Sequence, residues 1–441
     1  MNPSAPAPVV RISLPSHSPY LPILKSARVF AQASLLAVGL LVSVTSATAQ
    51  VTPFPTTVVK QPSLPISVTV TMTAGGTSTT PGVLTEGISG LDYAAAGGTC
   101  TANQNYNVGD TCTVNVIFTP LYPGRRDGAV AITTSNGALL GSALMTGTGV
   151  GSLAVLVPGE INTVVGNNAW LYAGDGVLAT NASIYLPMGV VTDAAGNIFL
   201  SDSSNNRIRR VDATTGLIST IAGDGNPGFA GDNGPAKQAE ISSPAGLILD
   251  GAGNIYFADT GNDVIRRIDA FSGFITTVAG MGNAQGYSGN NGVATSAKLS
   301  SPEGVAFDTA QNMYITDTGN NVIREVNALT SIITTIAGTA TAGYNGDGVA
   351  TTKNLNAPWG LSVGPDGTIY FADLTNNMVR MVSTAGILTT ISGTGQLGFS
   401  GDGSTASAAI LKFLIRNPSL PQRSCTTSRS TPLARNPDPF L

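Results

Sequence analysis

The chain has 441 residues, of which only 10% are charged, and a formal net charge of −4 at pH 7. An acidic chain without clusters of Lys or Arg does not bind nucleic acid by neutralising phosphates, and it is poorly suited to anionic membrane surfaces. The single histidine, His17, lies in a segment that we expect to be removed. A mature chain without histidine excludes Ser-His-Asp catalysis, Cys-His catalysis and zinc sites built on imidazole.

The N-terminal segment has the order of features that is typical of an export signal. Three basic residues precede an apolar stretch at 29–44, and small residues follow at 47–49. We therefore expect a signal peptide over 1–49 and a mature protein that is secreted, periplasmic or on the cell surface. A transmembrane anchor is the alternative, but the apolar stretch is short for a bilayer. After cleavage we expect no stable insertion into a membrane.

Residues 50–65 predict a Pro-rich linker, and 66–150 predict a separate all-β unit. Runs that alternate apolar and polar residues are separated there by Gly, Asn and Asp, as in a β-sandwich. Cys100 and Cys112 are expected to pair in an oxidising compartment. On chain-entropy grounds this disulfide would contribute roughly 3 kcal/mol to stability.

This all-β unit resembles the Ig-like modules related to the ASH and HYDIN domains and to the bacterial choice-of-anchor D type. The resemblance rests on the spacing of the two cysteines, on the segments 114–120 and 124–126, and on Gly147-Thr148-Gly149. It implies an Ig-like β-sandwich.

Four copies of one pattern then follow, with starts at Pro187, Pro244, Pro302 and Pro358. Each copy predicts four short strands, which in the first copy are 189–192, 198–201, 207–212 and 218–222. The strands are rich in Ile, Val and Thr and are joined by Gly, Asn and Asp turns. Four antiparallel strands that recur at a constant period predict the blades of an all-β propeller. The predicted blades are 187–243, 244–301, 302–357 and 358–411, within a propeller region of 160–411.

The repeats resemble those of NHL-repeat propellers, specifically the long-blade kind of bacterial extracellular proteins and of the teneurin NHL domain. The third copy carries the resemblance in Gly-Val-Ala-Phe-Asp at 304–308, Asp-Thr-Gly-Asn-Asn at 317–321, Ile323-Arg324 and Thr-Thr-Ile-Ala-Gly at 334–338. The resemblance implies mostly six-bladed rings, whereas this chain has four complete blades. We therefore expect an incomplete, open ring.

Both ends of the repeat region depart from the pattern. The segment 161–166 reads as the last strand of a blade whose first three strands are missing. The tail at 412–441 abandons the repeat and contains Cys425, which has no partner cysteine. A frameshifted or truncated reading frame explains this tail, and a genuine disordered tail rich in Pro, Ser and Arg is the alternative.

Two residue types recur at fixed places in every blade, and we interpret both as structural. An aspartate ends each second strand and an arginine lies in each third strand, where the two can pair within one blade or between adjacent blades. The residues are Asp202, Asp259, Asp317 and Asp373, with Arg209, Arg266, Arg324 and Arg380.

The connections between blades carry the candidate binding face. Each places an aromatic residue before a Gly-Asp or Gly-Asn turn, and strand direction puts these connections on the same face as the Asp-rich turns. The candidates are Phe229, Asp232, Tyr287, Asn290, Tyr344, Asp347, Phe399 and Asp402. The rings either pack under their own loops or form a platform for sugar or protein. A calcium ion held by Asp and Asn oxygens is a weaker alternative, because no EF-hand spacing is present, and otherwise we expect no cofactor.

Two classes of function remain open from the sequence. The favoured one is an exported, non-catalytic binding or scaffold protein whose propeller face binds protein or carbohydrate. The alternative is a Ca-dependent propeller hydrolase or lyase of the lactonase kind, which needs several carboxylates that point into the central channel. The first strands offer Thr192, Ile248 and Phe307 there, with Asp193 and its equivalents nearer the turns.

Overall fold

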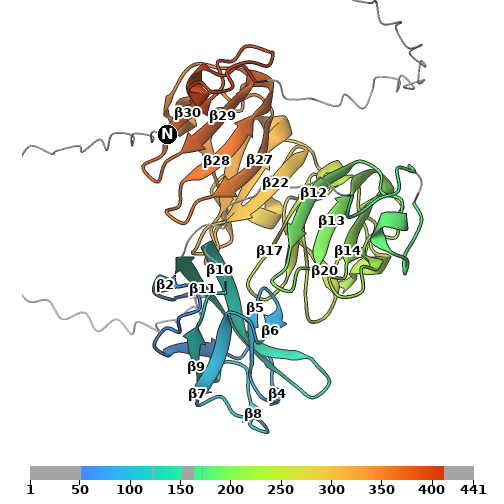
Figure 1. Cartoon of the computed structure of the whole chain (residues 1–441), viewed down its shortest axis with the longest axis vertical. Coiled ribbons are helices and arrows are strands. Elements are labelled where there is room, and N and C mark those ends of the chain that lie inside the picture. Colours follow the sequence, from blue (N-terminus) through green and yellow to red (C-terminus); the bar gives the residue numbers. More distant parts are fainter. Residues whose placement is uncertain (1–50, 122–123, 151–162, 171, 412–441) are drawn as a thin grey trace, which may run out of the picture. The chain divides into compact units, whose positions relative to one another are not determined.

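The computed structural model describes residues 51–121, 124–150, 163–170 and 172–411 (Figure 1). The predicted signal peptide and the predicted tail lie outside these residues, as do the first two residues of the segment 161–166; its other four residues form no strand. All regular structure in the described ranges is β-strand or short 3-10 turn, which agrees with the predicted all-β class. In these ranges no helix is long and apolar enough to span a membrane.

Over residues 51–121 and 124–150, the N-terminal unit has eleven strands in a six-stranded, a three-stranded and a two-stranded sheet. The strands are β1 (Thr52–Pro53), β2 (Thr57–Val58), β3 (Ile66–Thr71), β4 (Gly76–Thr77), β5 (Gly82–Thr85), β6 (Ile88–Ser89), β7 (Tyr93–Gly98), β8 (Asn105–Tyr106), β9 (Thr111–Phe118), β10 (Gly124–Thr133) and β11 (Leu139–Val150). The six-stranded sheet has the order β1-β11-β10-β5-β6, with β2 also on β11, and the three-stranded sheet has the order β3-β9-β7.

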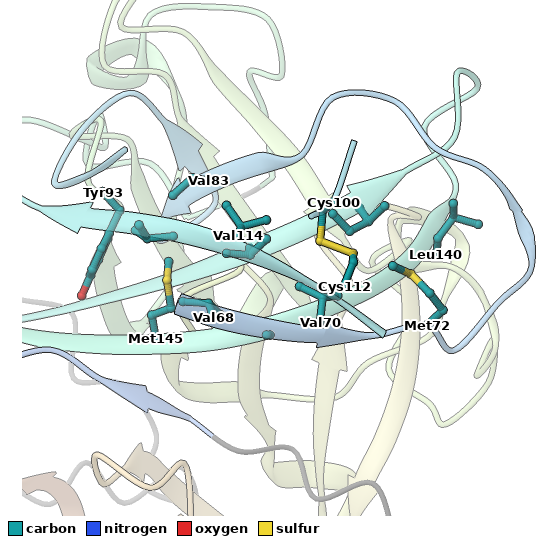
Figure 2. Packing of buried hydrophobic residues seen from close by; sticks show 14 of the residues in the cluster. Val68, Val70, Met72, Val83, Tyr93, Cys100, Cys112, Val114, Leu140 and Met145 are labelled. Carbon is teal, nitrogen blue, oxygen red and sulfur yellow. A yellow bond between two sulfur atoms is a disulfide. The ribbon is translucent and has the colours of Figure 1, made fainter. Parts of the chain in front are cut away.

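One hydrophobic core lies between these sheets (Figure 2). Alternate residues of β3 and β9 are buried, so that Val68 and Val70 face Val114 and Val116 in the core. The predicted disulfide between Cys100 and Cys112 is confirmed and lies in this core. The predicted linker is partly structured, because β1 and β2 pair in parallel with β11 and Phe54 between them is buried.

The repeat region forms four antiparallel sheets, which we call blades 1 to 4. Blade 1 contains β12 (Pro187–Thr192), β13 (Ile198–Asp202), β14 (Arg207–Val211) and β15 (Ile218–Ala222). Blade 2 contains β16 (Gly234–Pro235), β17 (Pro244–Leu249), β18 (Ile255–Asp259), β19 (Val264–Ile268) and β20 (Phe274–Ala279). Blade 3 contains β21 (Gly292–Val293), β22 (Pro302–Phe307), β23 (Met313–Asp317), β24 (Val322–Val326) and β25 (Ile332–Ala337). Blade 4 contains β26 (Gly348–Val349), β27 (Pro358–Val363), β28 (Ile369–Asp373), β29 (Met378–Val382) and β30 (Ile387–Ser392).

The four strands predicted for each blade are present, and three blades carry a fifth. The two-residue strands β16, β21 and β26 come from the connections between blades and pair with β20, β25 and β30. Their brevity explains why strand patterns did not predict them. The connections that follow blades 1, 2 and 3 therefore each belong to the outer edge of the next blade.

A 3-10 turn and one left-handed residue join the second and third strands of every blade. The turns η2 (Ser203–Asn205), η4 (Thr260–Asn262), η6 (Thr318–Asn320) and η8 (Leu374–Asn376) end at Asn206, Asp263, Asn321 and Asn377. These four residues have φ between 51° and 58°, which Asn and Asp tolerate better than other residues with a side chain. Five further turns lie in the connections: η1 (Ala179–Asn181), η3 (Ala236–Gln238), η5 (Ala294–Ser296), η7 (Ala350–Thr352) and η9 (Ala406–Ala408).

Neighbouring blades share hydrophobic cores. Blade 1 packs against blade 2 through Phe199 and Ile208, and blade 2 packs against blade 3 through Ala258 and Ile265. The inner strands β12, β17, β22 and β27 contact one another in this order. Among the described residues, extensive contact between β12 and β27 is absent.

Candidate functional site

Each blade buries one arginine completely. The guanidinium groups of Arg209, Arg266, Arg324 and Arg380 have no exposed surface. A buried cation costs several kcal/mol unless hydrogen bonds and an opposite charge compensate it. The groups around these arginines therefore decide whether each blade is stable.

The first compensating group is the aspartate at the end of the second strand of the same blade. The distance from arginine Nη1 to aspartate Oδ2 is 3.1 Å in blade 1, 3.4 Å in blades 2 and 3, and 2.9 Å in blade 4. Each arginine pairs with the aspartate of its own blade, because the second and third strands of a blade are adjacent and antiparallel. In blade 1, Asp202 is opposite Arg207, and Arg209 lies two residues further along the same face.

The same aspartates also tie down the segment that leads into the inner strand. Asp259 Oδ1 accepts the backbone N–H of Ser242 at 2.7 Å, and its Oδ2 accepts the Asn262 amide at 2.8 Å. Asp317 makes the equivalent bonds to Ser300 and Asn320. Burial outweighs these bonds and raises the pKa of both carboxyl groups to about 6.

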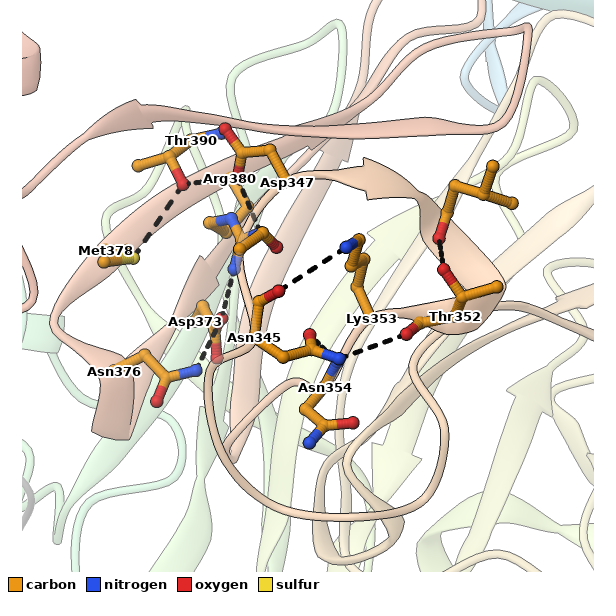
Figure 3. A network of polar contacts seen from close by, with 12 residues as sticks. Asn345, Asp347, Thr352, Lys353, Asn354, Asp373, Asn376, Met378, Arg380 and Thr390 are labelled. Carbon is orange, nitrogen blue, oxygen red and sulfur yellow. Dashed lines mark hydrogen bonds and ion pairs between the residues drawn. The ribbon is translucent and has the colours of Figure 1, made fainter.

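The second compensating group comes from the connection that precedes each blade. Arg209, Arg266 and Arg380 donate to Asp175, Asp232 and Asp347 at 2.7, 2.6 and 3.0 Å. In blade 4, Asp347 also accepts the N–H of Thr390 at 3.0 Å (Figure 3). Partial burial raises the pKa of Asp347, but the Thr390 and Arg380 bonds outweigh it and hold the pKa below its usual value. Two residues of the predicted binding face, Asp232 and Asp347, thus contact buried arginines.

An aromatic ring from the same connection covers each guanidinium. The carbon Cζ of the arginine lies 4.9 Å from the ring centre of Tyr172 in blade 1, 5.2 Å from Phe229 and Tyr287 in blades 2 and 3, and 5.3 Å from Tyr344 in blade 4. At these distances the ring face attracts the cation. We call the two acidic or amide groups and the ring around each arginine the arginine clamp.

The clamp of blade 3 lacks one carboxylate. Asn290 lies where the other blades have aspartate, and its Oδ1 accepts the N–H of Thr335 at 2.6 Å, as the aspartates do. Arg324 Nη2 instead donates only to the carbonyl oxygen of Ser288, at 3.3 Å. An amide cannot accept a bond through its nitrogen, so Asn290 leaves the guanidinium with a single ion pair.

Replacing Asn290 with aspartate is expected to stabilise the protein by about 1–2 kcal/mol, because it restores the charge-assisted bond of the other blades. Chemical denaturation of Asn290→Asp measures the change. The matched variant Asp347→Asn removes the same bond from blade 4 and is expected to be destabilising by a similar amount. An unchanged midpoint for Asn290→Asp would contradict the role given to the second carboxylate.

The rings of Tyr287 and Tyr344 are only half covered by their clamps. Tyr287 remains 44% exposed and Tyr344 50% exposed. Phe399, in the connection after blade 4, is 84% exposed, and neither Phe399 nor Asp402 contacts an arginine among the described residues. The connections lie on the same face as the turns between second and third strands. The side-chain amides of these turns donate to backbone carbonyl groups of the connections, at 2.6 Å from Asn262, 2.7 Å from Asn320 and 2.8 Å from Asn376.

One acidic residue on the inner strands was missed from the sequence. Glu303 is the second residue of β22, at the position held by Met188, Ala245 and Trp359 in the other blades. Its carboxylate has no hydrogen bond or ion pair within the described residues. Burial raises its pKa to about 8. The only sequence signal was an acidic residue at a position that is otherwise apolar.

The aspartates near the turns between first and second strands have a structural environment. Asp250 Oδ1 accepts the N–H groups of Ala252 and Asn254 at 2.9 and 3.0 Å, and its Oδ2 accepts the Asn254 amide at 2.7 Å. Asp193 and Asp308 make closely similar bonds. Within the part of the chain that the structure describes, no group of three or more His, Cys, Asp or Glu side chains is arranged to hold a metal ion.

No protein-family model matches the chain. A segment of 87 residues is 41% identical to Protein SUPPRESSOR OF QUENCHING 1, chloroplastic, of Arabidopsis thaliana and covers 20% of this chain and 8% of that protein. The chain is 28% identical over 183 residues to human NHL repeat-containing protein 2, which covers 40% of this chain and 25% of the relative. It is 29% identical over 235 residues to mouse Teneurin-3, which covers 48% of this chain and 8% of the relative.

These similarities support an NHL-type propeller. The matched segments span a quarter or less of the length of the relatives. Among solved structures, an auxiliary nutrient binding protein from Bacteroides ovatus is 14% identical, with a TM-score of 0.36, over 82% of this chain and 87% of that chain. A TM-score this low adds nothing to the assignment.

Proposed function

We propose that this chain is an exported, non-catalytic binding or scaffold protein in which the connection face of the NHL-type propeller binds protein or carbohydrate. In this proposal residues 1–49 direct export and are removed. The N-terminal unit is an Ig-like module that acts as a spacer. The blades supply the ligand platform.

The observation that carries the proposal is a row of three exposed rings, at equivalent places of the connections before blade 3, before blade 4 and after blade 4. Tyr287, Tyr344 and Phe399 expose 44%, 50% and 84% of their surface. The first two are held in place from beneath, because each ring lies on a buried guanidinium. A ring fixed in this way loses little conformational entropy on binding, and aromatic residues are frequent anchors of both protein and sugar ligands.

A glycan and protein array probed with the exported chain tests this function. The variant Tyr287→Ala/Tyr344→Ala is expected to weaken any captured ligand at least tenfold. The control is Leu329→Ala, which removes a side chain that is 57% exposed at the turn between third and fourth strands, on the opposite face. If the array captures no ligand, or if the tyrosine double variant and the Leu329→Ala control bind the ligand equally well, the face that carries the connections is not the binding site.

The second candidate is a Ca-dependent hydrolase or lyase of the lactonase kind, and Glu303 is the one observation in its favour. This carboxylate is the acidic residue that the described inner strands offer, and a calcium site needs several oxygen ligands. Calorimetric titration with Ca²⁺ distinguishes the two candidates. Micromolar binding that Glu303→Gln abolishes, together with turnover of a lactone, would favour the enzyme.

A further inference from the structure

Blade 1 leaves an apolar flank open on the side that faces away from blade 2. Val190 is 68% exposed, whereas the equivalent residues Leu247 and Val305, which face a preceding blade, are 8% and 6% exposed. Met188 is 45% exposed beside it. An open pocket of about 960 Å³ lies on this flank, lined on one side by residues of β12 and β13, such as Val190 and Ile198, and on the other by residues of the preceding connection, such as Val164.

The contacts between neighbouring blades show what such a flank accepts. In the core between blades 2 and 3, the side chains Ala245, Ala258 and Ile265 of blade 2 pack against blade 3. The residues at the same positions of blade 4 are Trp359, Ala372 and Val379, and all three are partly exposed. Blade 4 therefore presents the surface that a following blade would cover, and blade 1 presents the surface that a preceding blade would cover.

The connection after blade 4 carries half of an arginine clamp. Phe399 and Asp402 have the spacing of Phe229 and Asp232, which hold Arg266 of blade 2. Both residues are exposed and lack an arginine among the described residues. Leu411, at the end of this connection, is partly exposed, whereas its equivalent Leu355 is fully buried.

We propose that a second copy of this chain covers both surfaces, so that blade 4 and residues 394–411 of one copy dock onto blade 1 of another. Phe399 and Asp402 of the first copy then hold Arg209 of the second. Blade 4 and residues 394–411 require three features of a partner: a free apolar flank, a third-strand arginine, and a backbone N–H for the clamp carboxylate. Blade 1 has all three, and its N–H is that of Thr220. The junction repeats the contacts that already join blades 1 to 4 within one chain.

Residues 163–170 and 172–186 occupy the position on blade 1 that residues 394–411 would take. They hold Arg209 through Tyr172 and Asp175, which have the same spacing as Phe399 and Asp402. Docking therefore replaces one connection by another that makes the same kind of contacts. The exchange itself changes little free energy, and burial of the two apolar flanks favours the associated state.

Light scattering after size-exclusion chromatography of the exported chain, between about 1 and 100 µM, tests the junction. We expect concentration-dependent association into species of at least two copies. Val190→Asp and Phe399→Ala/Asp402→Ala are each expected to raise the dissociation constant at least tenfold. Because all three side chains are exposed in a single copy, melting temperatures should stay unchanged. Leu329→Asp is the control, since its side chain is exposed away from both flanks and should not alter association.

A mixture of the two variants identifies the surfaces that meet. The Val190→Asp copy retains an intact blade 4, and the Phe399→Ala/Asp402→Ala copy retains an intact blade 1, so an equimolar mixture should form a 1:1 dimer. A wild-type chain that stays monomeric over this range overturns the proposal. Association that survives both variants overturns it as well, and so does a mixture that remains monomeric, because a symmetric contact or another occupant would then use the flank.

Discussion

Replacing Arg266 with methionine is expected to lower the free energy of unfolding by about 3–5 kcal/mol, because it removes the cation and leaves its carboxylates behind. Asp259 has no exposed surface, and Asp232 is 30% exposed at its side chain. With the guanidinium gone, Asp259 has only neutral donors to compensate its charge, and the ring of Phe229 loses its partner. Calorimetry or chemical denaturation of Arg266→Met measures the loss.

The matched control for Arg266→Met is Arg210→Met. Arg210 also pairs with an aspartate, Asp212, at 2.9 Å, but both side chains are about one-third exposed. Exposed ion pairs contribute at most about 1 kcal/mol, so this variant should unfold nearly as the wild type does. Equal losses in the two variants would mean that burial of the clamp does not determine its contribution.

Replacing Glu303 with glutamine is expected to remove a pH dependence of stability of several kcal/mol. Burial raises the pKa of Glu303 from 4.5 to about 8 in the folded chain. Between these two pH values the folded state holds a proton that the unfolded state has lost. Glu303 therefore makes the folded chain less stable as the pH rises from 4.5 to 8, and a neutral glutamine does not.

Melting temperatures of wild type and Glu303→Gln between pH 4 and pH 9 test this expectation. The two curves should nearly coincide at pH 4, and the variant should be the more stable at pH 9. Asp366→Asn serves as the control, because hydrogen bonds from Thr368 lower the pKa of that exposed carboxyl group and its removal cannot reproduce the effect. Parallel curves over the whole range would show that Glu303 is ionised in the folded chain at neutral pH.

The four strands of each blade could be predicted because local patterns specify them. In blade 1 the predicted segments 198–201 and 218–222 differ from the strands by at most one residue. β-Branched residues and Asn or Gly turns are local signals, and four repetitions of them reinforce one another. The outer strands β16, β21 and β26 are two residues long, so no alternation develops in them.

The sequence predicted which residues belong to the candidate site, but it did not predict which of them contact one another. The sequence assigned the eight repeated Asp and Arg residues a structural role, and it placed Asp232, Asp347 and the aromatic residues on a binding face. The structure brings these groups together around buried guanidinium groups. Residues 33 or 34 positions apart meet in each clamp, and periodicity alone contains no information on contacts at that separation.

The sequence by itself determined the all-β class, the number of blades and the pairing of Cys100 with Cys112, because short-range patterns and cysteine count carry that information. Only the tertiary structure decided that Asp347 clamps Arg380, that Glu303 is half-buried without a hydrogen-bond partner among the described residues, and that Val190 is exposed. Burial and charge compensation depend on how neighbouring blades pack. The local sequence around a residue does not specify which blade packs against it.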